Sequence, residues 1–125
     1  MIQVGTNLHV ADNSGARLVQ CVKLLRQPKK RLGRVAAMLV VSVKSLVRKQ
    51  KAKVKKGHLY KAIVCETASR VHRLDGSSFV CARNTSILLS RVQMQPVASR
   101  IAGITPYELR VRGKSKLLSL SMANV

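Results

Sequence analysis

The stretch His9-Val-Ala-Asp-Asn-Ser-Gly-Ala-Arg-Leu-Val-Gln-Cys21 joins two apolar segments through a polar tetrapeptide. The residues before position 11 alternate between apolar and polar, and residues 18–25 are largely apolar, which is typical of β-strands. Residues 12–15 are strong turn formers, because an Asp or Asn side chain can accept a hydrogen bond from the backbone two residues on and Gly adopts a positive φ at no steric cost. The sequence therefore predicts two strands joined by a turn at Asp12, which we expect to tolerate replacement by Asn.

Further short segments have the β-branched or apolar composition of strands, with turn signals between them. Asp75-Gly76 and Arg83-Asn84 are the clearest of these turns. Strands interrupted this often favour a small closed barrel over an open sheet. We predict a mainly β fold, a small closed barrel, whose further strand candidates lie at residues 35–47, 59–67, 79–81 and 87–89.

The last quarter of the chain has a different character, because Pro96, Gly103 and Pro106 interrupt the strand pattern. Thr105, Pro106 and Glu108 have the spacing of a helix start, with Thr105 as the N-cap and Glu108 in the capping-box position. No internal repeat or domain boundary is visible. We therefore expect a single domain over residues 1–125, with a C-terminal loop region bearing short helices at about 96–125.

The balance of charges limits the classes of partner. The chain has 24 Lys and Arg residues against four Asp and Glu, a formal net charge of +20 at pH 7. A compact protein this basic repels itself, so we expect a polyanionic partner, with nucleic acid before an anionic membrane surface. The longest apolar stretch, residues 35–43, is much shorter than the roughly 20 residues of a membrane-spanning helix. The opening residues also lack the basic and apolar pattern of a signal peptide.

The acidic and cysteine residues show no catalytic or metal-binding pattern. The four acids are far apart in sequence, and we assign Asp75 to its Asp-Gly turn and Glu108 to helix capping. The three cysteines lack CxxC spacing and lie among aliphatic residues, which predicts small buried side chains. A zinc site that includes His72 is the less favoured alternative. We expect no enzyme activity, no catalytic residue, no metal and no cofactor.

Residues 48–56 form the densest basic segment, with six cations in nine residues. Lys49, Lys51, Lys53 and Lys55 alternate, so an extended backbone would place all four on one face. We predict an extended basic arm at about 47–57 that presents ammonium groups to phosphates; a solvated loop is the alternative. The candidate RNA-binding residues of this segment are Arg48, Lys49, Lys51, Lys53, Lys55 and Lys56.

Other basic residues are spread over several loops, which suggests contact with RNA on more than one side. Such contacts neutralise phosphates and release counterions. The two Tyr and one Phe are too few for a base-stacking platform, so recognition of shape and backbone is favoured. A free-standing, non-specific nucleic-acid-binding or chaperone protein is the alternative. The remaining candidates are Lys29, Lys30, Arg31, Arg34, Lys44, Arg70, Arg73, Arg83, Arg110, Lys114 and Lys116.

Several stretches, in order, resemble the universal large-subunit ribosomal protein fourteen family: "MIQVGTNLHVADNSGARLVQCVKLL", "KVKKGHLYKAIVCET", "DGSS", "QPVASRIAGI", "YELR" and "KLLSL". The resemblance implies a small five-stranded antiparallel β-barrel, with a projecting basic β-ribbon at about 47–57 and small C-terminal helices. It also implies binding to large-subunit rRNA, an intersubunit bridge to small-subunit rRNA and contact with a neighbouring large-subunit protein. By resemblance, Asn13, Ser14 and Arg17 lie at a functional turn and are candidate RNA-binding residues, and Lys53, Lys55 and Lys56 belong to the ribbon. Ser99 and Arg100 lie near the intersubunit face where a silencing factor can dock.

The departures from the family pattern point to a divergent ribosome. Ala102 stands where the family has Phe, Cys81 replaces an aromatic residue, and residues 35–37 read Val-Ala-Ala where Val-Gly-Asp is common. Two extra residues lengthen the basic segment. We expect a mitochondrial ribosome, with a plastid or the bacterial cytoplasm as alternatives.

Overall fold

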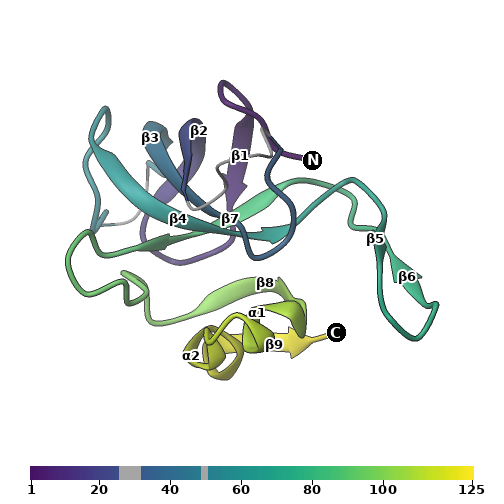
Figure 1. The fold of residues 1–125 in the computed structure, drawn as a ribbon. Helices are drawn as coiled ribbons and strands as arrows, with labels where there is room; N and C mark the ends of the chain where they lie inside the picture. Colours follow the sequence, from purple (N-terminus) through teal and green to yellow (C-terminus); the bar gives the residue numbers. More distant parts are fainter. Residues whose placement is uncertain (26–31, 49–50) are drawn as a thin grey trace.

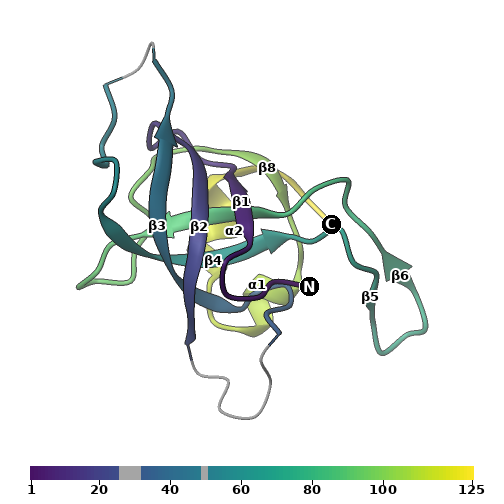
Figure 2. The same cartoon turned by 90° about the horizontal axis from the view of Figure 1, so that it is seen from above.

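The computed structural model describes residues 1–25, 32–48 and 51–125. Its centre is a closed barrel with strand order β1-β2-β3-β4-β7, seen from two directions in Figures 1 and 2. The strands are β1 (Asn7–Val10), β2 (Ala16–Leu25), β3 (Met38–Leu46), β4 (Leu59–Glu66) and β7 (Thr85–Leu89).

The predicted five-stranded barrel is confirmed, with one difference in strand direction. The β1/β2, β2/β3, β3/β4 and β4/β7 pairs are antiparallel, whereas the closing β1/β7 pair is parallel. Strands that alternate in direction can close a ring only when their number is even. A closed barrel of five strands must therefore contain a parallel pair.

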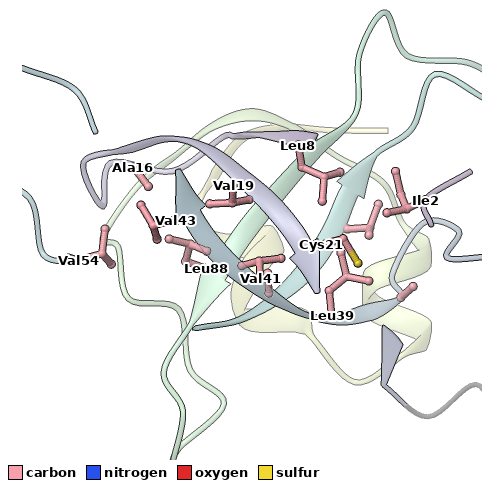
Figure 3. Packing of buried hydrophobic residues seen from close by; sticks show 13 residues of the cluster. Ile2, Leu8, Ala16, Val19, Cys21, Leu39, Val41, Val43, Val54 and Leu88 are labelled. Carbon is pink, nitrogen blue, oxygen red and sulfur yellow. The ribbon is translucent and has the colours of Figure 1, made fainter. Parts of the chain in front are cut away.

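The barrel interior is filled by aliphatic side chains from every strand (Figure 3). Leu39, Val41 and Val43 of β3 are fully buried at every second position, as the two-residue period of a strand requires. β4 and β7 instead carry unbroken apolar runs, because both of their faces are covered. Leu88 points into the barrel, whereas Ile87 belongs to a second cluster that faces the C-terminal region.

The C-terminal region packs below β4 and β7 in Figure 1. It contains β8 (Ile101–Thr105), α1 (Glu108–Val111), α2 (Ser115–Leu120) and β9 (Ser121–Asn124), with β8 and β9 paired in parallel. Ile101, Leu109 and Leu117 fill the cluster against the barrel. The predicted short helices are confirmed, and the β8/β9 pair was not predicted.

The predicted helix cap at Thr105 is wrong. Thr105 is the last residue of β8, and Tyr107 is the N-cap of α1 without a side-chain hydrogen bond. The Thr105 hydroxyl donates to the Ala123 carbonyl and to Asn124 Oδ1, across the β8/β9 pair. A partner 18 residues away therefore replaces the local capping interaction.

The two-stranded ribbon that projects from the barrel is not at residues 47–57, where a ribbon was predicted. It consists of β5 (Val71–His72) and β6 (Ser78–Phe79), which extend away from the barrel in Figures 1 and 2. The described residues of the basic segment, 47–48 and 51–57, contain no strand. The ribbon turn follows the Asp75-Gly76 signal, with Gly76 at φ 85°.

Candidate nucleic-acid interface

The turn at residues 12–15 is built as predicted and is then attached to β7. Asp12 Oδ1 accepts a hydrogen bond from the Ser14 amide at 3.0 Å, and Oδ2 accepts one from the Leu88 amide at 2.9 Å. Burial raises the pKa of the Asp12 carboxyl above 3.8, opposed by these hydrogen bonds and by the charge of Lys53. Because both oxygens accept from N–H groups, the expectation that Asn would be tolerated at Asp12 no longer holds.

Asn13 connects this turn to the segment that precedes β8. Its Oδ1 accepts from the Ser99 and Arg100 amides at 3.1 and 3.2 Å, and its Nδ2 donates to Ser99 Oγ at 3.1 Å. The Asn13 amide in turn donates to the Arg100 carbonyl. The residues assigned separately to RNA binding and to the intersubunit face therefore form one surface.

The basic segment begins against the same turn. The Lys53 amide donates to the Ser14 carbonyl at 2.8 Å, and the Val47 amide donates to the Gly15 carbonyl at 2.9 Å. Gly15 has a φ of +91°, and a Cβ at this position would lie 2.7 Å from the Ala52 Cα. Turn and basic segment are thus fixed to each other through backbone contacts.

Ser14 requires a correction as an RNA-binding residue. Its side chain is fully buried, and its hydroxyl accepts from the Ala16 amide at 3.5 Å. The Ser14 hydroxyl is enclosed in the turn and already hydrogen-bonded there, so it is not available to a phosphate. Ser14 shapes the turn, while the neighbouring Asn13 and Arg17 are exposed.

A cleft of about 740 Å³ lies between the turn and β8. Arg17, Arg83 and Arg100 line it from three separate segments, and Asp12 and Glu66 line it as well. Glu66 is buried and accepts from the Ile104 amide at 3.0 Å. Two of the four acids in the chain therefore line one cleft, although they are 54 positions apart in sequence.

The described part of the basic segment is not a strand, but its lysines are available to a partner. Lys51, Lys53, Lys55 and Lys56 are all exposed, whereas Val54 is buried in the barrel core. Val54 and the Lys53 amide therefore attach the segment to the barrel. Lys44 on β3 and Arg48 beyond it are also exposed, and Lys49 lies outside the described residues.

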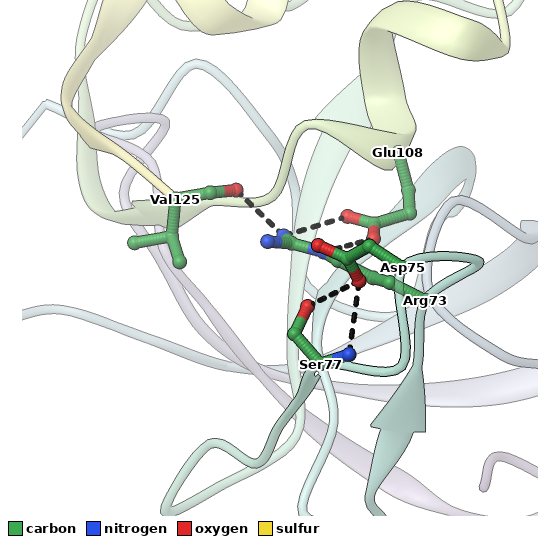
Figure 4. A network of polar contacts seen from close by, with 5 residues as sticks. All are labelled: Arg73, Asp75, Ser77, Glu108 and Val125. Carbon is green, nitrogen blue, oxygen red and sulfur yellow. Dashed lines mark hydrogen bonds and ion pairs between the residues drawn. The ribbon is translucent and has the colours of Figure 1, made fainter.

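Arg73 on the ribbon is engaged within the protein (Figure 4). Its Nε donates to Glu108 Oε1 at 2.8 Å, a second nitrogen donates to the Val125 carbonyl at 2.9 Å, and its guanidinium lies 4.7 Å from the Phe79 ring centroid. Glu108 therefore pairs with Arg73 and does not cap its helix as predicted. Arg73 holds the ribbon to α1, which leaves Arg70 as the exposed cation of the ribbon.

The remaining predicted cations are dispersed. Arg110 and Arg34 are exposed, Lys114 is half-buried, and Lys116 Nζ donates to Gln95 Oε1 at 3.2 Å. Lys29, Lys30 and Arg31 lie outside the described residues. Among the cations in residues 1–25, 32–48 and 51–125, Arg73 is the one that forms an ion pair.

Sequence reasoning did not single out Arg91. Its Nε donates to the Leu59 carbonyl at 2.7 Å, and its own carbonyl accepts from Lys61 Nζ at 2.9 Å. Its guanidinium also lies over the Tyr60 ring, 5.9 Å from the centroid. These contacts fix the start of β4. The partners are about thirty residues apart, so no local sequence pattern indicates that they meet.

The cysteines behave largely as predicted. Cys21 and Cys65 are buried and Cys81 is half-buried, and all three are free thiols. Burial raises the pKa of the Cys65 thiol to about 12, so this thiol is not a reactive nucleophile at neutral pH. In the described part of the chain, no group of three His, Cys, Asp or Glu residues could hold a metal ion, and no helix could span a membrane.

Comparison with models of known protein families gives the context for this surface. The family model described as Ribosomal protein L14p/L23e matches residues 1–125, the whole chain.

Proposed function

The chain belongs to the Ribosomal protein L14p/L23e family, and on this premise we propose that it helps form an intersubunit bridge through the surface around Asn13, Ser99 and Arg100. As a member of the family it is a structural protein of the large ribosomal subunit that binds rRNA and neighbouring ribosomal proteins. Membership favours this role over the alternative of a free-standing nucleic-acid binder.

The observation that carries the proposal is the junction between the turn and the segment before β8. The Asn13 side chain makes three hydrogen bonds to Ser99 and Arg100, and its amide makes a fourth, so one surface combines residues 86 positions apart. Arg17, Arg83 and Arg100 give this surface three cations suited to forked contacts with phosphate.

The distribution of charge supports two contact regions. All four acids lie in the described part of the chain, where Arg73–Glu108 is the ion pair. The lysines of residues 51–56 are exposed without a carboxylate partner and suit the phosphates of large-subunit rRNA. We assign stable binding to these lysines and subunit joining to the surface around Arg100.

Two sets of variants separate these roles. In the triple variant Lys53→Ala, Lys55→Ala and Lys56→Ala, we expect loss from the large subunit when sucrose gradients are run after a high-salt wash. Arg100→Ala should remain in the large subunit but lower the ratio of joined ribosomes to free subunits. Lys23→Ala, an exposed charge on β2, is the matched control.

Each result has a defined meaning. If Arg100→Ala joins subunits as well as Lys23→Ala does, the bridge assignment is wrong. If the unaltered protein leaves the large subunit in the salt wash, the assignment of stable rRNA binding is wrong.

We also propose that the ribosome is mitochondrial, because Ala102, Cys81 and Ala36 depart from the pattern that the resemblance implies. Fractionation of source cells, followed by mass spectrometry of their ribosomes, tests this directly. Recovery from plastid or bacterial cytoplasmic ribosomes would refute it. A silencing factor would dock beside Ser99 and Arg100, and the small Ala102 offers it less apolar surface than the Phe of the family.

A further inference from the structure

The cleft beside the turn at residues 12–15 is lined by a row of polar side chains that has no part in the proposed intersubunit bridge. Thr85 at the start of β7 pairs in register with Glu66 on β4 and with His9 on β1. Side chains in register on neighbouring strands share a face of the sheet, and all three residues line the cleft. Carboxylate, hydroxyl and imidazole therefore form one row across three strands.

Thr85 carries an unexplained polar atom. Its side chain is 3% exposed, and its Oγ1 has no hydrogen-bond partner among the described residues. A buried hydroxyl without a partner costs free energy, because it loses its hydrogen bonds to water. By contrast, Thr67 is only 1% exposed, and its hydroxyl donates a hydrogen bond to the Ser69 carbonyl.

The other groups of the cleft limit the chemistry of an occupant. Ionised Glu66 can only accept hydrogen bonds, so a group placed against it must donate. Arg17, Arg83 and Arg100 favour an anion. The occupant therefore combines an anionic group with hydrogen-bond donors, and the cleft volume of about 740 Å³ is that of a small-molecule site.

We propose that this cleft holds one nucleotide of an RNA strand, with its phosphate at the arginines and its base edge or ribose 2′-hydroxyl on Thr85 Oγ1 and the Glu66 carboxylate. The proposal rests on the rRNA binding described above and adds a defined subsite to it. A splayed nucleotide has both required features, since RNA-binding proteins commonly read unstacked bases and the 2′-hydroxyl.

Nucleoside monophosphates test the subsite on the full-length protein. GMP, AMP, CMP and UMP are each titrated at moderate salt, with amide shifts followed by NMR and inorganic phosphate as the reference anion. We expect at least one nucleotide to give saturable shifts at Thr85 and at residues 101–103. Phosphate alone should shift the amides of the arginines without reaching Thr85.

Thr85→Val is the decisive variant because it keeps the shape and removes the hydroxyl. It should weaken nucleotide binding about 3- to 10-fold, the effect of one lost hydrogen bond, and leave phosphate binding unchanged. The melting temperature of the free protein should rise, because an unpaired hydroxyl is removed. Thr67→Val is the matched control: its melting temperature should fall and its nucleotide affinity should not change.

Three results would overturn the subsite: no saturable nucleotide shifts, identical shifts with phosphate alone, or a lower melting temperature for Thr85→Val, which would reveal an internal partner. In each case sedimentation with the large subunit would still support the role in the ribosome, so the two proposals fail independently.

A photo-crosslinking residue at Ala102, which is exposed and lines the cleft, identifies the source of the nucleotide. A crosslink to rRNA in isolated large subunits assigns it to the large subunit. A crosslink to RNA that forms only in joined ribosomes assigns it to the small subunit. Crosslinks to protein alone would contradict the proposal.

Discussion

Two turns with the same local chemistry have different roles in this protein. Asp12 Oδ1 accepts from the Ser14 amide at 3.0 Å, and Asp75 Oδ1 accepts from the Ser77 amide at 2.9 Å. The first turn is buried at Ser14 and Gly15, and the second oxygen of its Asp12 carboxylate accepts from the Leu88 amide on β7. The second is exposed at the tip of the ribbon, and its further hydrogen bond is to the Ser77 hydroxyl next to it.

The comparison shows that an Asp turn is specified locally but its importance is not. Gly15 and Gly76 both have positive φ angles, of 91° and 85°. Only the position of Gly15 is crowded by backbone, whereas a Cβ at Gly76 meets nothing within 4 Å. The buried turn should therefore be sensitive to changes that the exposed turn accepts.

The largest difference is expected at the two glycines. Gly15→Ala should lower the free energy of unfolding by about 2–5 kcal/mol, because backbone strain adds to a clash with Ala52. Gly76→Ala should cost only the strain, about 1–2 kcal/mol. Urea unfolding of both variants measures this, and equal losses would show that the packing against Ala52 does not matter.

The carboxylates should differ next. Asp12→Asn replaces an acceptor by an NH₂ group that faces an N–H donor, either Ser14 or Leu88, and should cost about 1–3 kcal/mol. Asp75→Asn is exposed and can keep its bond to the Ser77 amide. It should leave the melting temperature nearly unchanged. A tolerated Asp12→Asn would mean that the Leu88 bond contributes little.

The ribbon is also attached through long-range contacts, those of Arg73 with Glu108 and Val125. They are weaker than the contacts of the Asp12 turn because they lie near the surface. Arg73→Ala should speed amide hydrogen exchange at residues 71–79 and in α1, since it removes the bonds to Glu108 and Val125. High salt should shrink the difference, because exposed ion pairs are screened. Arg70→Ala is the control. Faster exchange at the buried turn as well would show that ribbon and barrel are coupled.

The two carboxyls should titrate on opposite sides of 3.8. Burial raises the pKa of Asp12, whereas the Ser77 hydrogen bonds lower the pKa of Asp75. Asp12 therefore contributes stability at low pH that is lost as the pH rises through its folded pKa, and Asp75 contributes stability above 3.8 that is lost as the pH falls through its own. NMR titration of the carboxyl carbons checks this, and a shared midpoint would contradict it.

Strand positions and turns followed from residue patterns, with differences at strand ends. The strand predicted at residues 35–47 begins instead at Met38, because Ala36 has a φ of 63°. The pattern gave no sign of this, since a left-handed Ala is uncommon. The β8 and β9 strands were missed because 15 residues separate Thr105 from Ser121, so neither has a local partner.

Some residues of the candidate interface were likewise predicted from the sequence, and others were found only in the structure. Charge predicted the lysines of residues 51–56 as contacts, and the resemblance predicted Asn13, Arg17, Ser99 and Arg100. No residue pattern indicates that Glu66, Thr85 and His9 form a row, because that depends on strand register. Arg73 was predicted to bind RNA from its charge. Its pairing with Glu108 could not be seen in the sequence, because the two residues are 35 positions apart.

By itself, then, the sequence determined the net charge, the strands, the Asp turns and the family resemblance, all of which depend on composition or on neighbours within a few residues. The tertiary structure decided that Ser14 is buried, that Asn13 binds Ser99 and Arg100, and that two acids line one cleft. The physical reason is the closure of the barrel. Strand pairing fixes residues far apart in the chain in register, and only in that register do their polar groups become partners.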